Sequence, residues 1–150
     1  MQELLASTMA PSLIAEVIGG CPYTVVLSVA FDLGIELLTN GNKKCQNVFL
    51  WHLRSIEPSE ATKFFRTFTD IMVLTAKDYG NIRIERNEYD QASRDSGSRP
   101  TKPVEAVRES KQLQEKYCVF KMLEFLRLLN EGHNLDVQNV MENQVVRYSQ

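Results

Sequence analysis

Glu131 is the residue whose type and position could do the most chemistry in this chain. It follows an apolar run, residues 117–129, that has the length and spacing of a buried helix. The carbonyl end of a helix carries a partial charge of about −0.5, so a carboxylate is unfavourable there and a basic side chain is usual. A bound cation would offset both negative charges, and oxygen ligands of this kind suit Ca²⁺. Part of a calcium site is therefore one of two interpretations of Glu131.

A purely structural role for Glu131 stays open beside the calcium site. Ca²⁺ takes about 6–8 oxygen ligands, so one carboxylate cannot hold the ion, and a surface or N–H-bonded glutamate is the simpler interpretation. His133 lies two residues further on and could orient Glu131 as a supporting group. The only other histidine, His52, is predicted to lie on a helix surface beside Trp51. Two histidines are too few for a zinc cluster.

No catalytic constellation accompanies these residues. The sequence contains no Ser/His/Asp or Cys/His grouping at motif spacing, no phosphate-binding loop and no dinucleotide-binding glycine motif. We therefore expect that the chain is not an enzyme. We expect no cofactor on this segment alone, and Ca²⁺ only as part of a larger chain.

Glu131 belongs to the second of two copies of one sequence phrase. Residues 37–48 read LLTNGNKKCQNV, and residues 128–140 read LLNEGHNLDVQNV. In both copies a Leu-Leu pair ends an apolar run, a Gly follows, and an Asn then precedes a Gln by four residues. Such repetition is typical of stacked helical repeats.

The Asn and Gln of the phrase have a predicted structural role. They are Asn42 and Gln46 in the first copy, and Asn134 and Gln138 in the second. We expect each Asn to cap the helix that follows and each Gln to bond free carbonyls of a neighbouring turn. This corner predicts an all-α protein, an armadillo-like α-solenoid of stacked helices.

Hydrophobic periodicity predicts the helices that position the two corners. Residues 23–39 are apolar except for a narrow stripe of Ser28, Asp32 and Glu36, which predicts a mostly buried, innermost helix. Residues 117–129 are predicted to form a second inner helix. A further helix is predicted to begin at a Ser12 cap. The remaining predicted helices cover residues 2–10, 42–54, 59 to about 77, and 134 to about 146.

A charged segment divides the predicted helices. Residues 87–112 contain two prolines and dense alternating charge, but no Leu, Ile, Phe, Met or Trp. Such a composition cannot bury enough apolar surface to offset an ordering cost of about 1–2 kcal/mol per residue. We therefore predict armadillo-like helices over residues 1–86, a mobile, disordered charged linker over residues 87–112, and a helix pair over residues 113–150.

Composition favours a soluble segment that binds no nucleic acid and does not insert into a membrane. The net charge of −2 over 150 residues, without a basic patch, gives no attraction to polyanions. No run approaches the ~20 apolar residues of a membrane span, and the N-terminus has no signal-peptide pattern. Cys21, Cys45 and Cys118 have no CxxC spacing, which is typical of reduced cytosolic thiols.

The second copy of the phrase carries a family resemblance. FLRLLNEGHNLDVQNVMENQ resembles the run Phe-Leu-x-Leu-Leu-Cys-Glu-x-His-Asn-x-x-x-Gln-Asn of the inositol trisphosphate receptor and ryanodine receptor superfamily, in its cytosolic armadillo (RIH-associated) region. The resemblance covers most of residues 12–143, including LGIELLTNGNKKCQ, SEATKFF and the charged insertion. SEATKFF is similar to the inositol trisphosphate branch, and Glu131-Gly132-His133 to the ryanodine branch. The chain departs from the family at Asn130, where Cys is usual, and at Val140-Met141, where a Leu-Arg pair is usual.

The resemblance implies a function as well as a fold. It implies a regulatory segment of an intracellular ligand-gated calcium-release channel that relays ligand state to the pore, with the inositol trisphosphate receptor type favoured over the ryanodine receptor type. Glu131 would be half of the activating Ca²⁺ site and His133 a supporting residue. The second Glu, in a Leu-Thr-Glu motif, and a backbone carbonyl near the pore would lie outside residues 1–150.

The same resemblance implies the partners and the cellular location of the segment. Its partners would be the rest of the channel polypeptide in a tetramer, at the cytosolic face of the endoplasmic reticulum membrane. The alternative is an armadillo-type scaffold or adaptor that binds protein partners and has no ion role.

Overall fold

Prolines and an asparagine stand at the starts of three helices. Pro11 lies in the first turn of α2 (Ala10–Gly20) and Pro58 opens α5 (Pro58–Asp95), where a missing N–H removes no helix hydrogen bond. Asn42 caps α4 (Lys43–Ser55), because its side-chain oxygen accepts from the Cys45 N–H at 3.2 Å. The other described helices, α3, α7 and α8, cover Thr24–Leu38, Val119–Leu129 and Leu135–Arg147.

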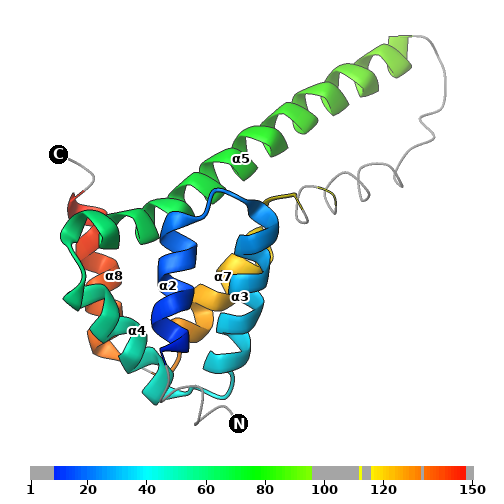
Figure 1. Cartoon of the computed structure of the whole chain (residues 1–150). Coiled ribbons are helices and arrows are strands. Elements are labelled where there is room, and N and C mark those ends of the chain that lie inside the picture. The colour runs from blue at the N-terminus through cyan, green and yellow to red at the C-terminus, as the bar shows by residue number, and fades with distance from the viewer. Residues whose placement is uncertain (1–8, 96–111, 113–115, 133, 148–150) are drawn as a thin grey trace. The chain divides into compact units, whose positions relative to one another are not determined.

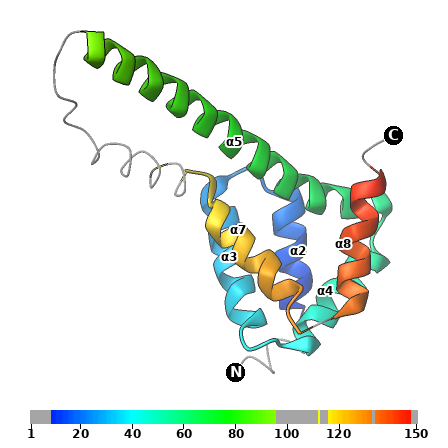
Figure 2. The same cartoon turned by 180° about the vertical axis from the view of Figure 1, so that it is seen from behind.

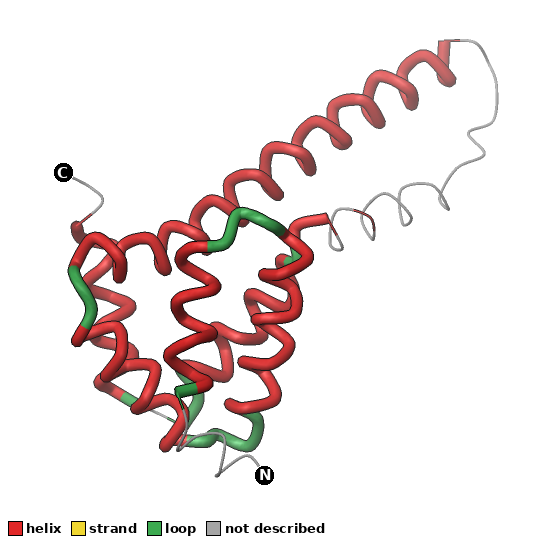
Figure 3. The backbone as a smooth tube through the Cα atoms, viewed as in Figure 1, coloured by secondary structure: helices red, strands yellow, loops and turns green. Residues whose placement is uncertain are grey.

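The structure, a computed structural model, describes residues 9–95, 112, 116–132 and 134–147, without the side chains of residues 89, 92, 93, 95 and 143–147. Every regular element in these residues is a helix and none is a strand (Figure 3), which confirms the predicted all-α class. None of these helices is long and apolar enough to cross a membrane. The helix predicted over residues 2–10 falls almost entirely outside the described ranges.

The chain divides into two compact units, Met1–Thr69 with Phe120–Gln150, and Asp70–Val119. In the first unit α3 lies beside α7, and α4 beside α8 (Figures 1 and 2). Lys121 of α7 donates to Ser28 Oγ at 2.7 Å and to Asp32 Oδ2 at 2.6 Å on α3. Arg54 of α4 and Asp136 of α8 form an exposed ion pair at 3.7 Å. Helices from the two ends of the sequence thus share one unit.

Phenylalanine rings form the core of the first unit. The ring centroid of Phe125, on α7, lies 5.7 Å from that of Phe31 and 5.5 Å from that of Phe49. Phe68 lies 4.8 Å from Phe64, edge to face, and 6.1 Å from Phe31. Contacts of this geometry are worth about 0.5–1.5 kcal/mol each beyond area burial. Phe64, Phe65 and Phe68 of α5 are all buried in this core.

A glycine allows Phe125 to pack directly on the backbone of α3. A Cβ atom on Gly34 would lie only 2.6 Å from Cε2 and 2.7 Å from Cδ2 of the Phe125 ring. Thr67 holds α5 against α2, because its hydroxyl donates to the Ile18 carbonyl at 2.9 Å. These contacts set the spacing of the helices around the aromatic core.

The predicted start of the second helix is wrong. Ser12 does not cap it; α2 already begins at Ala10, and Ser12 is buried inside its first turns. The reason is that Pro11 fits the first turn of a helix, so the Ala-Pro pair starts this helix and does not interrupt it.

The predicted linker begins too early. Helix α5 continues to Asp95, so residues 87–95 are helical rather than irregular. This stretch, NEYDQASRD, contains neither Pro nor Gly, the two residues that most disfavour a helix interior, so it can extend an existing helix without apolar burial. Residues 96–111 are not among those described.

Helix α3 is less buried than predicted. Val25, Val29 and Leu33 are exposed, together with Val26. The buried side of α3 is formed instead by Leu27, Phe31, Gly34 and Leu38, among others. The polar stripe of Ser28, Asp32 and Glu36 predicted only part of the exposed side of α3. The type of an apolar residue does not show whether another helix covers it.

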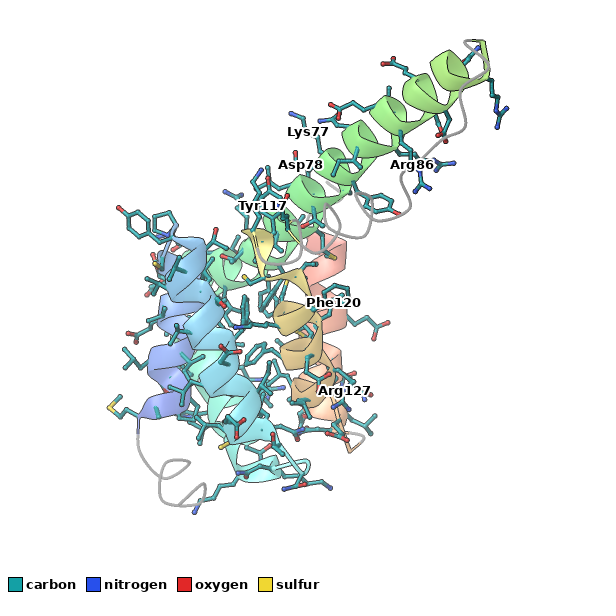
Figure 4. All side chains as sticks on the ribbon, turned by 90° about the vertical axis from the view of Figure 1, so that its right-hand side faces the viewer. Lys77, Asp78, Arg86, Tyr117, Phe120 and Arg127 are labelled. Atoms are coloured by element: carbon teal, nitrogen blue, oxygen red, sulfur yellow. The ribbon has the colours of Figure 1, made fainter. Side chains whose placement is uncertain are left out.

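The second unit contains a polar cluster around Asp78 of α5, labelled in Figure 4. The Tyr117 hydroxyl donates to Asp78 Oδ2 at 2.7 Å, and the Lys116 ammonium group donates to the same oxygen at 2.8 Å. The Lys116 nitrogen also lies 4.7 Å from the centre of the Tyr117 ring. The bonds from Lys116 and then Tyr117 lower the pKa of the Asp78 carboxyl.

Candidate functional site at the Glu131 corner

Glu131 lies in the turn that ends α7. Its N–H donates to the Leu128 carbonyl at 3.2 Å, which closes the last turn tightly. Gly132 then adopts a φ of +75°, the left-handed conformation in which a glycine commonly ends a helix. Gly41 has a φ of +65° at the corresponding place between α3 and α4. The predicted glycine corner is therefore present in both copies of the phrase.

The two copies also start their next helices in the same way. The Gln46 N–H donates to the Asn42 carbonyl at 3.1 Å, and the Gln138 N–H donates to the Asn134 carbonyl, also at 3.1 Å. Each is an early i to i+4 bond of the new helix, α4 or α8. The sequence repeat thus corresponds to a repeat of backbone structure.

Gln46 joins the two corners directly. Its side chain is fully buried, and Nε2 donates to the carbonyls of Leu128 and Glu131 at 2.9 Å each. Its Oε1 accepts from Asn134 Nδ2 at 3.2 Å. A side chain on α4 therefore adds a second donor to the Leu128 carbonyl, which also accepts from the Glu131 N–H, and supplies a donor to the Glu131 carbonyl. The prediction that this Gln bonds carbonyls of a neighbouring turn is confirmed, and the turn is that of the other copy.

Gln138 makes a much weaker contact than Gln46. It is half-buried, and its Nε2 lies 3.4 Å from the Asn130 carbonyl that accepts from it. That distance is well beyond the usual 2.9–3.0 Å of an N–H···O bond, about half an ångström longer. The two copies have equivalent backbone hydrogen bonds, but the side chain of Gln46 forms shorter hydrogen bonds than that of Gln138.

The Glu131 carboxylate has a cationic neighbour within the chain. Its Oε1 lies 3.5 Å from Nη1 of Arg127, one turn earlier on α7 and labelled in Figure 4. Arg127 makes shorter bonds to Glu124, at 2.8 Å and 2.7 Å. Glu124 first, and Glu131 after it, raise the pKa of the Arg127 guanidinium, which in turn lowers the pKa of Glu124. Arg127 therefore offsets part of the negative charge at the end of α7.

The corner fits calcium in donor type but not in donor number. The Glu131 carboxylate is 41% exposed and is a hard oxygen ligand of the kind that Ca²⁺ prefers. Within the described residues, no group of three or more His, Cys, Asp or Glu side chains could hold a metal ion. His133, the predicted supporting residue, is outside the described ranges.

His52 is not on the helix surface as predicted. It is 6% exposed, whereas the neighbouring Trp51 is 66% exposed. His52 follows the buried Phe49 by three residues, a spacing that places both on the inner side of α4. Its Nε2 has no hydrogen-bond partner in the described structure, and Glu16 Oε1 lies 3.9 Å away.

Sequence reasoning missed the contact of Lys121 with Ser28 and Asp32. A signal was available, because Ser28 and Asp32 stand one turn apart on one apolar helix and Lys121 is a cation within the other. Complementary charges on two otherwise apolar helices favour their packing against each other.

Comparison with known proteins identifies no relative: no family model, no curated protein and no solved structure matches this chain. The residues themselves and their geometry are therefore the basis for a functional proposal.

Proposed function

We propose that this chain is a regulatory cytosolic segment of an intracellular ligand-gated calcium-release channel of the inositol trisphosphate receptor type. In this role Glu131 supplies one carboxylate of a Ca²⁺ site that residues outside 1–150 complete, with His133 in support. The rest of the channel polypeptide forms the tetrameric pore, and the segment lies at the cytosolic face of the endoplasmic reticulum membrane. The resemblance of FLRLLNEGHNLDVQNVMENQ to that superfamily is the sequence basis of the proposal.

The bond between Gln46 and the Glu131 carbonyl is the observation that carries the proposal. It ties the backbone of the calcium ligand to α4, so a displacement of Glu131 on ion binding would move α4 as well. Rigid-body movement of packed helices is a common way of transmitting such a change. The contact of Glu131 with Arg127, at 3.5 Å, is an exposed and therefore weak ion pair, which Ca²⁺ could displace.

In the proposed segment the helices stack as an armadillo-like α-solenoid. The pairs α3–α4 and α7–α8 have the same corner and lie beside each other in the first unit. Repeats of this kind contact their neighbours through equivalent surfaces, as the two corners do through Gln46.

Calcium titration of the longest natural gene product that contains these residues tests the proposal. We expect that product to bind Ca²⁺ in isothermal titration calorimetry, and Glu131→Gln to weaken binding about tenfold or more, because a charged ligand is lost. Glu142→Gln, at an exposed position of α8, is the matched control and should bind normally. Residues 1–150 alone should show no measurable binding. An affinity that Glu131→Gln leaves unchanged would contradict the proposal.

A further inference from the structure

Helix α4 has a basic outer side. At about 100° per residue, all its exposed positions fall on one side of the helix and all its buried positions fall on the other. The exposed residues are Lys43, Lys44, Asn47, Trp51, Arg54 and Ser55. The helix contains no Asp or Glu at all. Its outer side is therefore cationic in a chain whose net charge is −2.

Lys43 and Lys44 stand where helices usually carry acidic residues. They open α4, whose first turn contains no acidic residue, and the start of a helix is the positive end of its dipole. Neither Lys has a carboxylate partner among the described residues; the Asp136 carboxylate of the neighbouring α8 is paired with Arg54 instead. Two uncompensated cations thus add to the helix dipole. A departure from local preference of this kind is typical of functional surfaces.

Two exposed apolar side chains accompany these cations. Trp51, the only tryptophan of the chain, is 66% exposed, and Leu135 at the start of α8 is 68% exposed. Leu135 follows Asn134, whose side chain donates to Asn47 on the outer side of α4 at 3.2 Å. Tryptophan is among the residues that most often dominate the binding energy of protein interfaces. Positive charge and apolar anchors therefore occur together on the α4 and α8 surface.

We propose that this surface, formed by Lys43, Lys44, Trp51 and Leu135 and called the α4 patch, binds an acidic amphipathic segment of a partner protein. Apolar side chains of the partner cover Trp51 and Leu135, and its Asp or Glu carboxylates lie at the two lysines. These carboxylates offset the lysine charges and the helix dipole together. The binding does not depend on calcium at Glu131, so it would serve a channel segment and a scaffold alike.

Three other occupants fit the α4 patch less well. Duplex nucleic acid carries one charge per about 1.7 Å and is held by many cationic contacts, which a small patch on a chain of net charge −2 does not supply. A helix that lies in a membrane surface needs its apolar face free, whereas Phe49, Leu50 and Leu53 of α4 are buried in the core. A second copy docked through the same patch would bring lysines against lysines.

Titration of the 150-residue chain with a peptide made only of Leu and Glu, with Leu on one helical face, tests the proposal. The fluorescence of Trp51 comes from the α4 patch alone, because the chain has no other tryptophan. We expect micromolar affinity and a shift of the Trp51 emission to shorter wavelength, since the peptide excludes water from the indole ring.

Charge reversal of the two lysines separates binding from folding. Lys43→Glu/Lys44→Glu should bind the peptide at least about tenfold more weakly, because like charges then meet. The same change should preserve the helical circular dichroism, since acidic residues are favourable at the start of a helix. If the circular dichroism is lost, Lys43→Gln/Lys44→Gln takes its place. Arg83→Glu/Arg86→Glu, at exposed positions of α5, is the matched control with the same change in net charge and should bind normally.

Several outcomes would overturn the proposal. These are absence of peptide binding, equal losses in the lysine and arginine double variants, a Trp51 emission that does not move on binding, or equal affinity for a peptide of Leu and Lys in the same order. Stronger binding to single-stranded DNA or to phosphatidylserine vesicles than to the Glu peptide would assign the patch to nucleic acid or lipid. A dimer that Lys43→Glu/Lys44→Glu dissociates would assign it to a second copy.

Discussion

The side-chain nitrogen of Gln46 lies 2.9 Å from the backbone carbonyl oxygen of Glu131, 85 residues away in the sequence. The two residues occupy the two copies of one sequence phrase, and the same nitrogen also bonds the Leu128 carbonyl. The Leu128 carbonyl also accepts from the Glu131 N–H at 3.2 Å, so Gln46 adds a second donor there and supplies a donor to the Glu131 carbonyl. A buried side chain of α4 therefore reinforces the C-terminal end of α7.

Replacing Gln46 with Leu should destabilise the protein by about 1–3 kcal/mol, the cost of leaving a buried carbonyl without its donor. Leu fills a similar volume, so the effect comes from the lost hydrogen bonds to Leu128 and Glu131 rather than from a cavity. Urea unfolding followed by circular dichroism measures the change in the free energy of unfolding.

Gln138→Leu is the matched control for this substitution. Gln138 is half-buried and makes a 3.4 Å contact with the Asn130 carbonyl, so its loss should cost less than about 1 kcal/mol. If the two variants lose the same free energy of unfolding, the bonds of Gln46 contribute no more to stability than the long contact of Gln138.

The corners were predictable from the sequence because their chemistry is local. Asn42 caps α4 through the Cys45 N–H three residues later, and Gly132 ends the α7 corner through its own positive φ. The partner of Gln46 was not predictable, since its role depends on how α7 packs against α4. The identity of Glu131 as a candidate ligand came from the sequence, but its pairing with Arg127 required the conformation of both side chains.

Burial was harder to predict than helix position. The exposed Val29 and the buried Leu27 are both apolar residues of α3, and only the placement of α2 and α7 separates them. His52 was wrongly predicted to share the helix surface with the exposed Trp51, because a helix turns by about 100° per residue and neighbouring residues face different sides. The tertiary arrangement, rather than residue type, decides these faces.

Gly34→Ala should destabilise the protein by about 1–3 kcal/mol, although Ala normally favours a helix. The added Cβ would lie 2.6 Å from the Phe125 ring, which cannot move because Phe31 and Phe49 pack around it. Thermal unfolding measures the effect as a lower midpoint temperature.

Gly80→Ala tests the same substitution in open space. A Cβ on Gly80, inside α5, has no heavy atom within 4 Å, so the change should stabilise the helix by about 0.5–1 kcal/mol. A Gly34→Ala variant as stable as the native chain would contradict the packing described for Phe125, and a destabilising Gly80→Ala would contradict the open space described at Gly80.

The thiols should react in two clearly separated phases. Cys21 is partly exposed, whereas Cys45 and Cys118 are buried, and burial raises the pKa of the Cys45 thiol although Lys44 opposes this. Since the thiolate is the reactive form, the native chain should give one fast thiol with Ellman's reagent and two that react only on unfolding. Cys21→Ser should remove the fast phase; a fast phase that persists would show that a second thiol is accessible.

The cluster around Asp78 should give a measurable pH dependence. Hydrogen bonds from Lys116 and Tyr117 lower the pKa of Asp78, so its titration, followed by NMR of the side-chain carboxyl carbon, should have its midpoint below the usual value of about 3.9. Because the folded pKa is below the unfolded one, Asp78 stabilises the fold above pH ~4, and this contribution is lost as the pH falls through the folded pKa.

Substitutions of the two donors should raise the Asp78 midpoint in a defined order. Lys116→Met should raise it most, because Lys116 is the largest cause of the shift, and Tyr117→Phe should raise it less by removing one hydrogen bond. Tyr79→Phe, at an exposed neighbouring position on α5, is the control and should leave the midpoint unchanged. A midpoint that moves equally in Tyr79→Phe and Tyr117→Phe would show that the hydroxyl of Tyr117 does not bond Asp78 in solution.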